Sequence, residues 1–144
     1  MNDKKDQIDI LGTHFYHGYA DKKGDRAEEL KQQRLSRGFD DTELWDLFST
    51  IAQFIEPRLK EFVKMDKMGI PGMIMDDEDL QNDSGITDET EEKYTKKWDE
   101  ILRKMHRAFE LILEDNVFSN QDPKMKEIEE GLELFAKYFQ CLWD

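Results

Sequence analysis

Three pairs of acidic residues stand at a spacing that suits metal-dependent chemistry. They are Glu43 and Asp46, Glu89 and Glu92, and Glu127 and Glu130. On a helix, residues three apart share a face, so each pair could offer two carboxylates to a magnesium ion that activates water or neutralises phosphates. The chain has 34 acidic residues, and the pairs lie off the apolar stripes of their helices. Solvent-facing carboxylates are therefore favoured, and a magnesium-dependent all-α nucleotide pyrophosphatase is kept as an alternative.

A second group of side chains has the chemistry of an anion site. Basic residues gather near the first predicted helix, and Arg34 and Arg37 are among them. Arg58 lies further along the chain and can join them only if the fold brings it close. Guanidinium groups bind phosphates and carboxylates through paired hydrogen bonds. These three arginines are the predicted contacts for a small anionic ligand. An alternative function is therefore counter-defence, in which an oligomer of the chain sequesters a nucleotide-type signal.

The remaining residues with reactive side chains predict no catalytic residue, cofactor or metal site. His14 and His17 stand three apart but are flanked by glycines, so a packing or turn role is favoured over a metal. His106 is expected to face solvent beside basic residues. The acidic stretch after Asp77 does not match the calcium loop of an EF-hand, which needs glycine and glutamate at fixed positions. No serine elbow or phosphate-binding glycine loop is present.

Charge and composition exclude several classes of partner. The formal net charge of −13 repels nucleic acid phosphates and anionic membranes. No apolar stretch has the length of a membrane span or a signal peptide, and Cys141 is the only cysteine. We therefore expect a cytoplasmic protein with neither direct nucleic acid binding nor membrane association, whose single thiol is buried and inert.

The elements that must position these residues are helices. Apolar residues recur at spacings of three and four over 41–66, 88–115 and 123–142, and a weaker helix is predicted over 25–36. Pro57 lies inside the second helix, where a kink is expected. Residues 1–24 are expected to form an irregular arm, and 67–86 an acidic linker within a single domain over 25–144. The predicted fold is all-α, an antiparallel bundle of three long helices and one shorter N-terminal helix.

The last helix carries two apolar faces. One face is formed by Ile128, Leu132 and Phe135 with their neighbours, and a second by Leu134, Tyr138 and Cys141. Such a helix is central in a bundle or forms half of an interface. Leu134, Tyr138, Cys141 and Trp143 are the predicted interface residues. Gly131, in the middle of this helix, indicates a close helix contact because glycine is otherwise unfavourable there.

Three blocks of sequence resemble a family of small helical proteins encoded by bacteriophages. They are RGFDDTELWDLFSTIAQFIEPRLKEF at 37–62, WDEILRKMHRAFELI at 98–112 and GLELFAKYFQCLWD at 131–144. The resemblance covers roughly 37–66 and 94–144 and leaves out the arm and the acidic linker. It implies a phage protein in the cytoplasm of a bacterial host, and it supplies neither an activity nor site residues.

Together these features favour a non-enzymatic protein that acts by binding. The aromatic-rich helices and the second apolar face of the last helix predict a contact with a host or phage protein, or with another copy of the chain.

Overall fold

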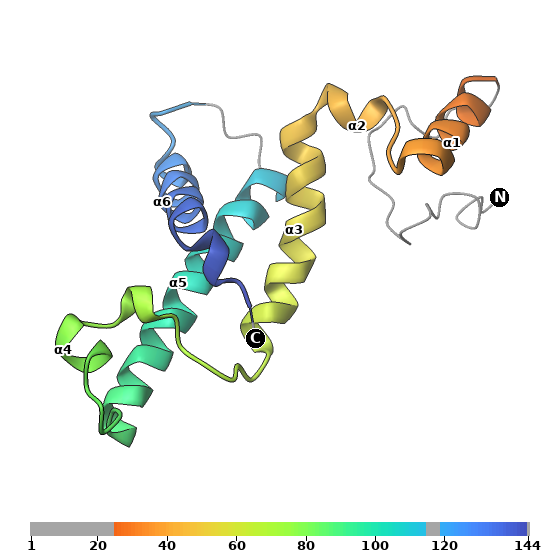
Figure 1. Ribbon diagram of the computed structural model, residues 1–144. Coiled ribbons are helices and arrows are strands. Elements are labelled where there is room, and N and C mark those ends of the chain that lie inside the picture. Colours follow the sequence, from red (N-terminus) through yellow and green to blue (C-terminus); the bar gives the residue numbers. More distant parts are fainter. Residues whose placement is uncertain (1–24, 115–118, 144) are drawn as a thin grey trace. The chain divides into compact units, whose positions relative to one another are not determined.

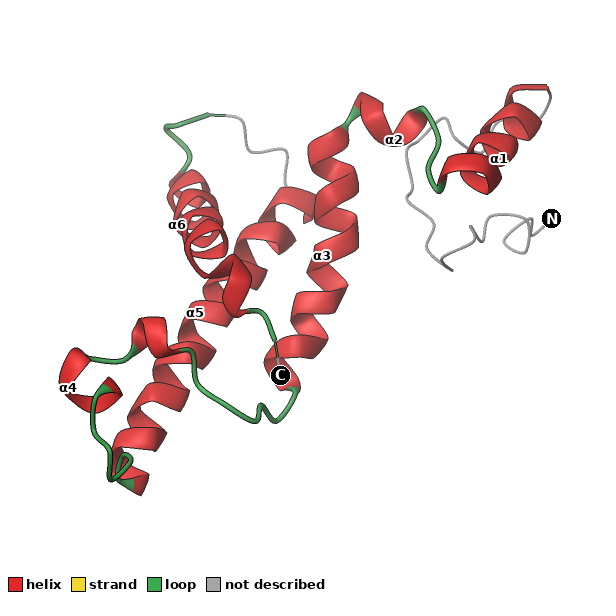
Figure 2. Cartoon of the chain, in the orientation of Figure 1, coloured by secondary structure: helices red, strands yellow, loops and turns green. Residues whose placement is uncertain are grey.

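The computed structural model describes residues 25–114 and 119–143, with helices as the regular structure of these ranges (Figures 1 and 2). The all-α prediction is confirmed. The predicted arm, with His14 and His17, lies outside the described residues. No helix within the described ranges is long and apolar enough to cross a membrane. The chain divides into two compact units, residues 1–55 and 56–144, where a single domain was expected.

The first unit contains α1 (Asp25–Arg37), α2 (Thr42–Trp45) and the first half of α3 (Leu47–Lys64). Gly38 ends α1 as predicted, because its φ of +84° suits glycine and turns the chain out of the helix. The helix expected over 41–66 is interrupted at Asp46, whose φ of −123° and ψ of 64° are not helical. Pro57, in contrast, lies inside α3, which continues on both sides of it.

A polar network joins the elements of the first unit. Asp40 Oδ1 accepts a hydrogen bond from Thr42 N over 2.9 Å, and Glu43 Oε2 accepts one from Asp40 N over 2.7 Å. This reciprocal pair caps the start of α2. Arg34 forms an ion pair with Asp40 from α1, and Thr50 Oγ1 of α3 donates to the Glu43 carbonyl over 2.8 Å. The three helices are thus connected through buried polar side chains.

The second unit is built on α5 (Asp88–Glu114) and α6 (Pro123–Tyr138), followed by the 3₁₀ turn η3 (Phe139–Cys141). The two helices are antiparallel, since Trp98 stacks edge-on against Tyr138 while Lys104 pairs with Glu130. The predicted starts are confirmed: Thr87 Oγ1 accepts from Thr90 N, and Asp122 Oδ1 accepts from Lys124 N. The core of this unit includes most of the predicted stripe of α5: Tyr94, Trp98, Ile101, Leu102, Met105, Ala108 and Phe109. At the end of the helix the prediction is wrong, because Leu111 is buried while Leu113, which the stripe included, is exposed.

The acidic linker is more ordered than the sequence indicated. It contains the 3₁₀ turn η2 (Gly72–Ile74) and the short helix α4 (Asp77–Leu80), beside the start of α5 (Figure 1). Ile74 is buried, and Lys97 Nζ donates to its carbonyl over 3.1 Å. The hydroxyl of buried Tyr94 donates to Asp79 and accepts from Asp76 N over 3.0 Å. The bond to Asp79 raises the pKa of the Tyr94 hydroxyl. Asp79 is therefore tied to the unit rather than fully solvated.

Replacing Tyr94 with phenylalanine tests this attachment. We expect amides of the 74–82 segment to lose about tenfold in protection from hydrogen exchange, because both hydroxyl bonds disappear while the ring stays packed. Lys93→Ala serves as control, since it removes the exposed contacts of Lys93 with Asp76 at 3.8 Å and with the face of the Tyr94 ring but leaves both hydroxyl bonds in place. Hydrogen exchange is measured by mass spectrometry. Equal protection of the 74–82 segment in both variants and in the parent protein would refute the attachment.

Candidate functional site

Two of the three predicted anion contacts are engaged with carboxylates of the chain itself. Arg34 pairs with Asp40, and Arg37 Nη2 donates to Asp41 Oδ1 over 2.6 Å. The Arg37 guanidinium also stacks over the Phe39 ring, 4.4 Å from its centroid. Both arginines belong to the first unit, whereas Arg58 is an exposed residue of the second unit. Arg34 and Arg37 therefore serve the polar network of their own unit.

The three carboxylate pairs have separate local environments. Glu43 is buried as the cap of α2, and Glu130 pairs with Lys104 over 2.8 Å. Glu89 is exposed at the start of α5, with Glu92 beside Lys96 at 3.0 Å. Among the described residues, no metal-binding group of three includes any of these pairs. Nothing in this arrangement favours the pyrophosphatase alternative.

The second face of α6 is packed inside its own unit. Tyr138 is buried against Trp98, and Cys141 is buried with its sulfur 3.5 Å from that of Met73. The prediction that Tyr138 and Cys141 are available to a partner is therefore wrong, because the unit itself covers them. The expected burial of the thiol is confirmed. Leu134 is half-buried, and Trp143 is exposed while its ring lies near Gly69.

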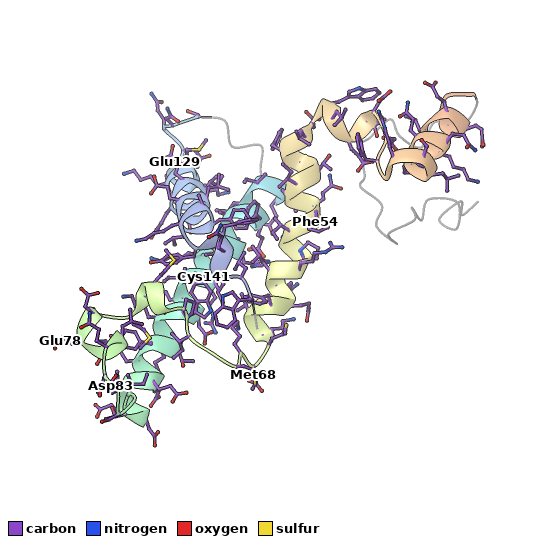
Figure 3. All side chains as sticks on the ribbon, viewed as in Figure 1. Phe54, Met68, Glu78, Asp83, Glu129 and Cys141 are labelled. Atoms are coloured by element: carbon purple, nitrogen blue, oxygen red, sulfur yellow. The ribbon has the colours of Figure 1, made fainter. Side chains whose placement is uncertain are left out.

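Large apolar side chains are instead exposed along α2 and the first half of α3. We call this group the α2–α3 apolar surface; it consists of Leu44, Trp45, Leu47, Phe48, Ile51 and Phe54. Each of these side chains retains between 43% and 54% of its accessible area, and Phe54 is labelled on α3 in Figure 3.

Small and polar residues of α2 and the first half of α3 are buried, whereas the large side chains of the α2–α3 apolar surface are exposed. Thr42, Thr50 and Ala52 all have relative exposures of 8% or less. This distribution reverses the usual order, in which aromatic and aliphatic side chains are the ones removed from water. A group of large exposed apolar side chains of this kind is typical of interaction sites.

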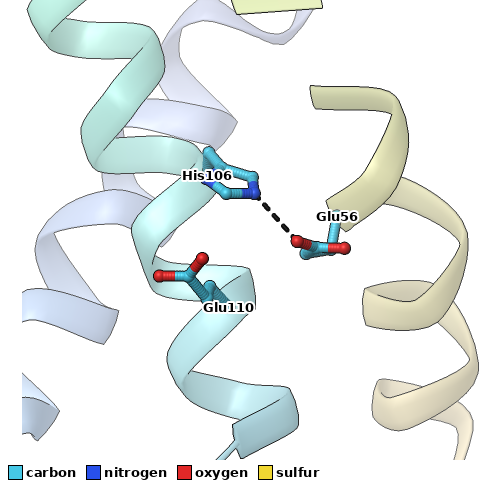
Figure 4. A group of neighbouring side chains, drawn as sticks. All are labelled: Glu56, His106 and Glu110. Carbon is cyan, nitrogen blue, oxygen red and sulfur yellow. Dashed lines mark hydrogen bonds and ion pairs between the residues drawn. The ribbon is translucent and has the colours of Figure 1, made fainter. Parts of the chain in front are cut away.

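A second candidate site lies in the other unit, between α3 and α5 (Figure 4). His106 Nε2 donates a hydrogen bond to Glu56 Oε1 over 2.9 Å, and Glu110 stands one turn along α5 from His106. One donor atom from each of the three residues lies within 4.8 Å of the other two. The side chains of His106 and Glu56 are 16% and 20% exposed. The expectation that His106 faces solvent is thus wrong, because α3 supplies a carboxylate that covers it.

A groove of about 510 Å³ opens beside the end of α3 in the same unit. Trp98 and Met75 line it together with Met65, Met68 and Ile70, and charged residues of both signs are also among its lining. Lys67, one of the basic residues, already donates to the carbonyls of Val63 and Met65. Because none of the three predicted arginines lines the groove, it gives no support to an anion site.

Comparisons with protein-family models, curated proteins and solved structures found no match. The assignment of function therefore depends on the chemistry of the two candidate sites.

Sequence reasoning missed both sites for identifiable reasons. Four residues of the α2–α3 apolar surface recur at helical spacing, which predicts a buried stripe: Leu44, Leu47, Phe48 and Ile51. Trp45 and Phe54 lie outside that predicted stripe. His106 and Glu110 have the four-residue spacing of two ligands on one helix face, a signal present in the sequence. Their third neighbour, Glu56, is 50 positions from His106, and no local pattern links the two.

Proposed function

We propose that the protein acts by binding, and that the α2–α3 apolar surface is the interface through which two copies of the chain associate. The observation that supports this proposal is the exposure of aromatic and aliphatic side chains on α2 and α3 while threonines and an alanine of the same segment are buried. Removal of apolar area from water is the dominant favourable contribution to most protein association.

The local charge distribution favours a second copy as the occupant. The chain carries a net charge of −13, so two copies repel each other at long range. Over residues 44–55, however, Asp46 is the only charged residue. Contact through this segment brings few like charges together. Physiological salt screens the repulsion between the other charges of the two copies beyond about 8 Å. A symmetric dimer is also the commonest arrangement of identical subunits.

The resemblance to phage-encoded helical proteins suggests the setting. In this proposal the chain is a non-enzymatic binding protein in the cytoplasm of an infected bacterium, and its dimer is the functional form. The alternative outcome of the test is that a host or phage protein binds to the same surface.

Trp45→Ala is the variant that tests the interface. Buried aromatic residues at the centre of an interface each contribute about 2 kcal/mol or more, and a symmetric dimer contains two copies of Trp45. The substitution should therefore cost about 4 kcal/mol and raise the dimer dissociation constant roughly a thousandfold. Sedimentation velocity over a series of protein concentrations measures this change. Circular dichroism must show that the variant keeps the helical content of the parent protein.

Trp143→Ala is the matched control. Trp143 is 52% exposed and Trp45 is 54% exposed, and both are tryptophans, but Trp143 lies outside the α2–α3 apolar surface. The control should leave the dissociation constant unchanged. A larger effect of Trp143→Ala than of Trp45→Ala would place the interface at the C-terminal end of the chain, as the sequence alone predicted. A protein that is monomeric at all concentrations would refute self-association.

A further inference from the structure

From the geometry of Glu56, His106 and Glu110 we infer a binding site for a first-row divalent transition metal ion, of which zinc is the representative. The site is independent of the α2–α3 apolar surface and belongs wholly to the second unit. One imidazole nitrogen and two carboxylate oxygens are the donors that α3 and α5 bring together here (Figure 4).

The spacing of the donors suits a metal ion of this size. Ligand atoms bound at about 2.0–2.2 Å from one ion lie roughly 3 Å apart when adjacent. His106 Nε2 and Glu56 Oε1 are already 2.9 Å apart. Glu110 is on the same face of α5 one turn away, so a rotation of its side chain completes a three-ligand set. On binding, the Nε2 proton passes to solvent and the imidazole binds the metal as the neutral tautomer protonated on Nδ1, while water fills the remaining positions.

The surroundings favour a specific site over a diffuse acidic patch. The three side chains are half-buried between helices, with Glu110 the most accessible at 31%. Arg107 contacts Glu110 and lies 3.8 Å from Glu114 as well. Arg107 therefore keeps a carboxylate partner when Glu110 turns toward the metal.

The donor set indicates which metals fit. Imidazole nitrogen selects zinc, iron, nickel or copper over magnesium and calcium, which prefer oxygen ligands. Exposed acidic residues elsewhere on this chain would attract magnesium and calcium through charge alone. Binding that persists in excess magnesium therefore distinguishes the histidine-containing site from the acidic surface.

The test is a titration of the full-length chain with zinc or cobalt in excess magnesium, followed by calorimetry and by the visible spectrum of cobalt. His14→Gln and His17→Gln are present in every sample, so that His106 is the only histidine. We expect one ion per chain and cobalt absorption bands that report nitrogen coordination. The absence of saturable binding under these conditions would overturn the inference.

Glu110→Gln is the decisive variant because it leaves the hydrogen bond between His106 and Glu56 in place. Loss of one carboxylate ligand should weaken metal binding at least tenfold, a change of the size produced even by altering outer-shell partners. Glu100→Gln is the matched control on the same helix, because Glu100 is 71% exposed and contacts Lys104 rather than the site, and this variant should bind as the parent does. Equal affinities for the two variants would show that His106 and Glu56 only connect the helices and do not belong to a metal site.

Discussion

Gly131→Ala is expected to destabilise the protein even though alanine is the better helix former. A Cβ atom at position 131 would lie 2.4 Å from the Cβ of Ala108 and 2.4 Å from the backbone oxygen of Lys104. Carbon atoms in contact are normally about 3.5–4.0 Å apart, so α5 and α6 must separate. Overpacking of this kind costs about 1–3 kcal/mol, which exceeds the roughly 1 kcal/mol that alanine contributes through helix propensity.

Urea unfolding followed by circular dichroism measures the effect. The free energy of unfolding should fall by about 1–2 kcal/mol for Gly131→Ala and further for Gly131→Val. Adding Ala108→Gly to Gly131→Ala should recover only part of the loss, because the Lys104 oxygen remains in the way.

Ala136→Gly provides the propensity control on the same helix. Ala136 is exposed on α6, so this change should cost about 1 kcal/mol through helix propensity alone. If Gly131→Ala instead stabilised the protein by the same amount, the close approach of α5 and α6 at position 131 would be refuted.

Gly131 also shows what a sequence can reveal about packing. Glycine is unfavourable in a helix interior, so its presence predicted a close contact, and the contact with α5 confirms it. The buried stripe of α5 was equally accessible to prediction. Tyr94, Trp98, Ile101 and Met105 recur at helical spacing, and all are buried.

The exposed surface could not be found in the same way. Helical periodicity identifies the side chains that share a face, but it does not say what covers that face. Leu47, Ile51 and Phe54 have the spacing of core residues, yet each is exposed by about half. Ala52 and Thr50 supply the buried contacts of α3 in this unit. Whether a face packs against the same chain or another depends on tertiary arrangement, which spacing does not encode.

The candidate metal site has the same limitation. The spacing of His106 and Glu110 places them on one face of α5, but the position of Glu56 depends on the packing of α3 beside α5. The break at Asp46 was also missed, because Leu44 and Phe48 on either side of it maintain a continuous apolar period.

Asp40→Ala is expected to have the largest effect on the first unit. Its side chain is 5% exposed and accepts hydrogen bonds from Thr42, while Arg34, 14% exposed, forms the ion pair. The substitution removes the cap of α2 and leaves a half-buried guanidinium without this partner. Loss of a cap costs about 1 kcal/mol and breaking a buried pair about 3 kcal/mol, so we expect a total near 3 kcal/mol after partial relaxation.

Two further variants separate the contributions. Asp40→Asn keeps an oxygen that caps Thr42 but removes the charge, so its effect should be smaller than that of Asp40→Ala. Asp41→Asn weakens the exposed pair with Arg37, which should cost less than about 1 kcal/mol. Hydrogen exchange of peptides from α1 and α2 measures the local stability in each case. An Asp41→Asn effect as large as that of Asp40→Ala would contradict the central role of Asp40.

Acidity provides an independent test of the same carboxylate. Burial raises the pKa of Asp40, but hydrogen bonds from Thr42 and Arg34 and the charge of Arg34 outweigh it, so the pKa lies below its ordinary value of 3.8. A group with a lowered pKa in the folded state contributes stability that is present above its unfolded pKa. This contribution is lost as the pH falls from about 4 through the lower folded value. Protection of α1 and α2 should therefore decrease over that range in the parent protein. In Asp40→Asn the share of this decrease due to Asp40 should disappear, because the amide has no proton to bind.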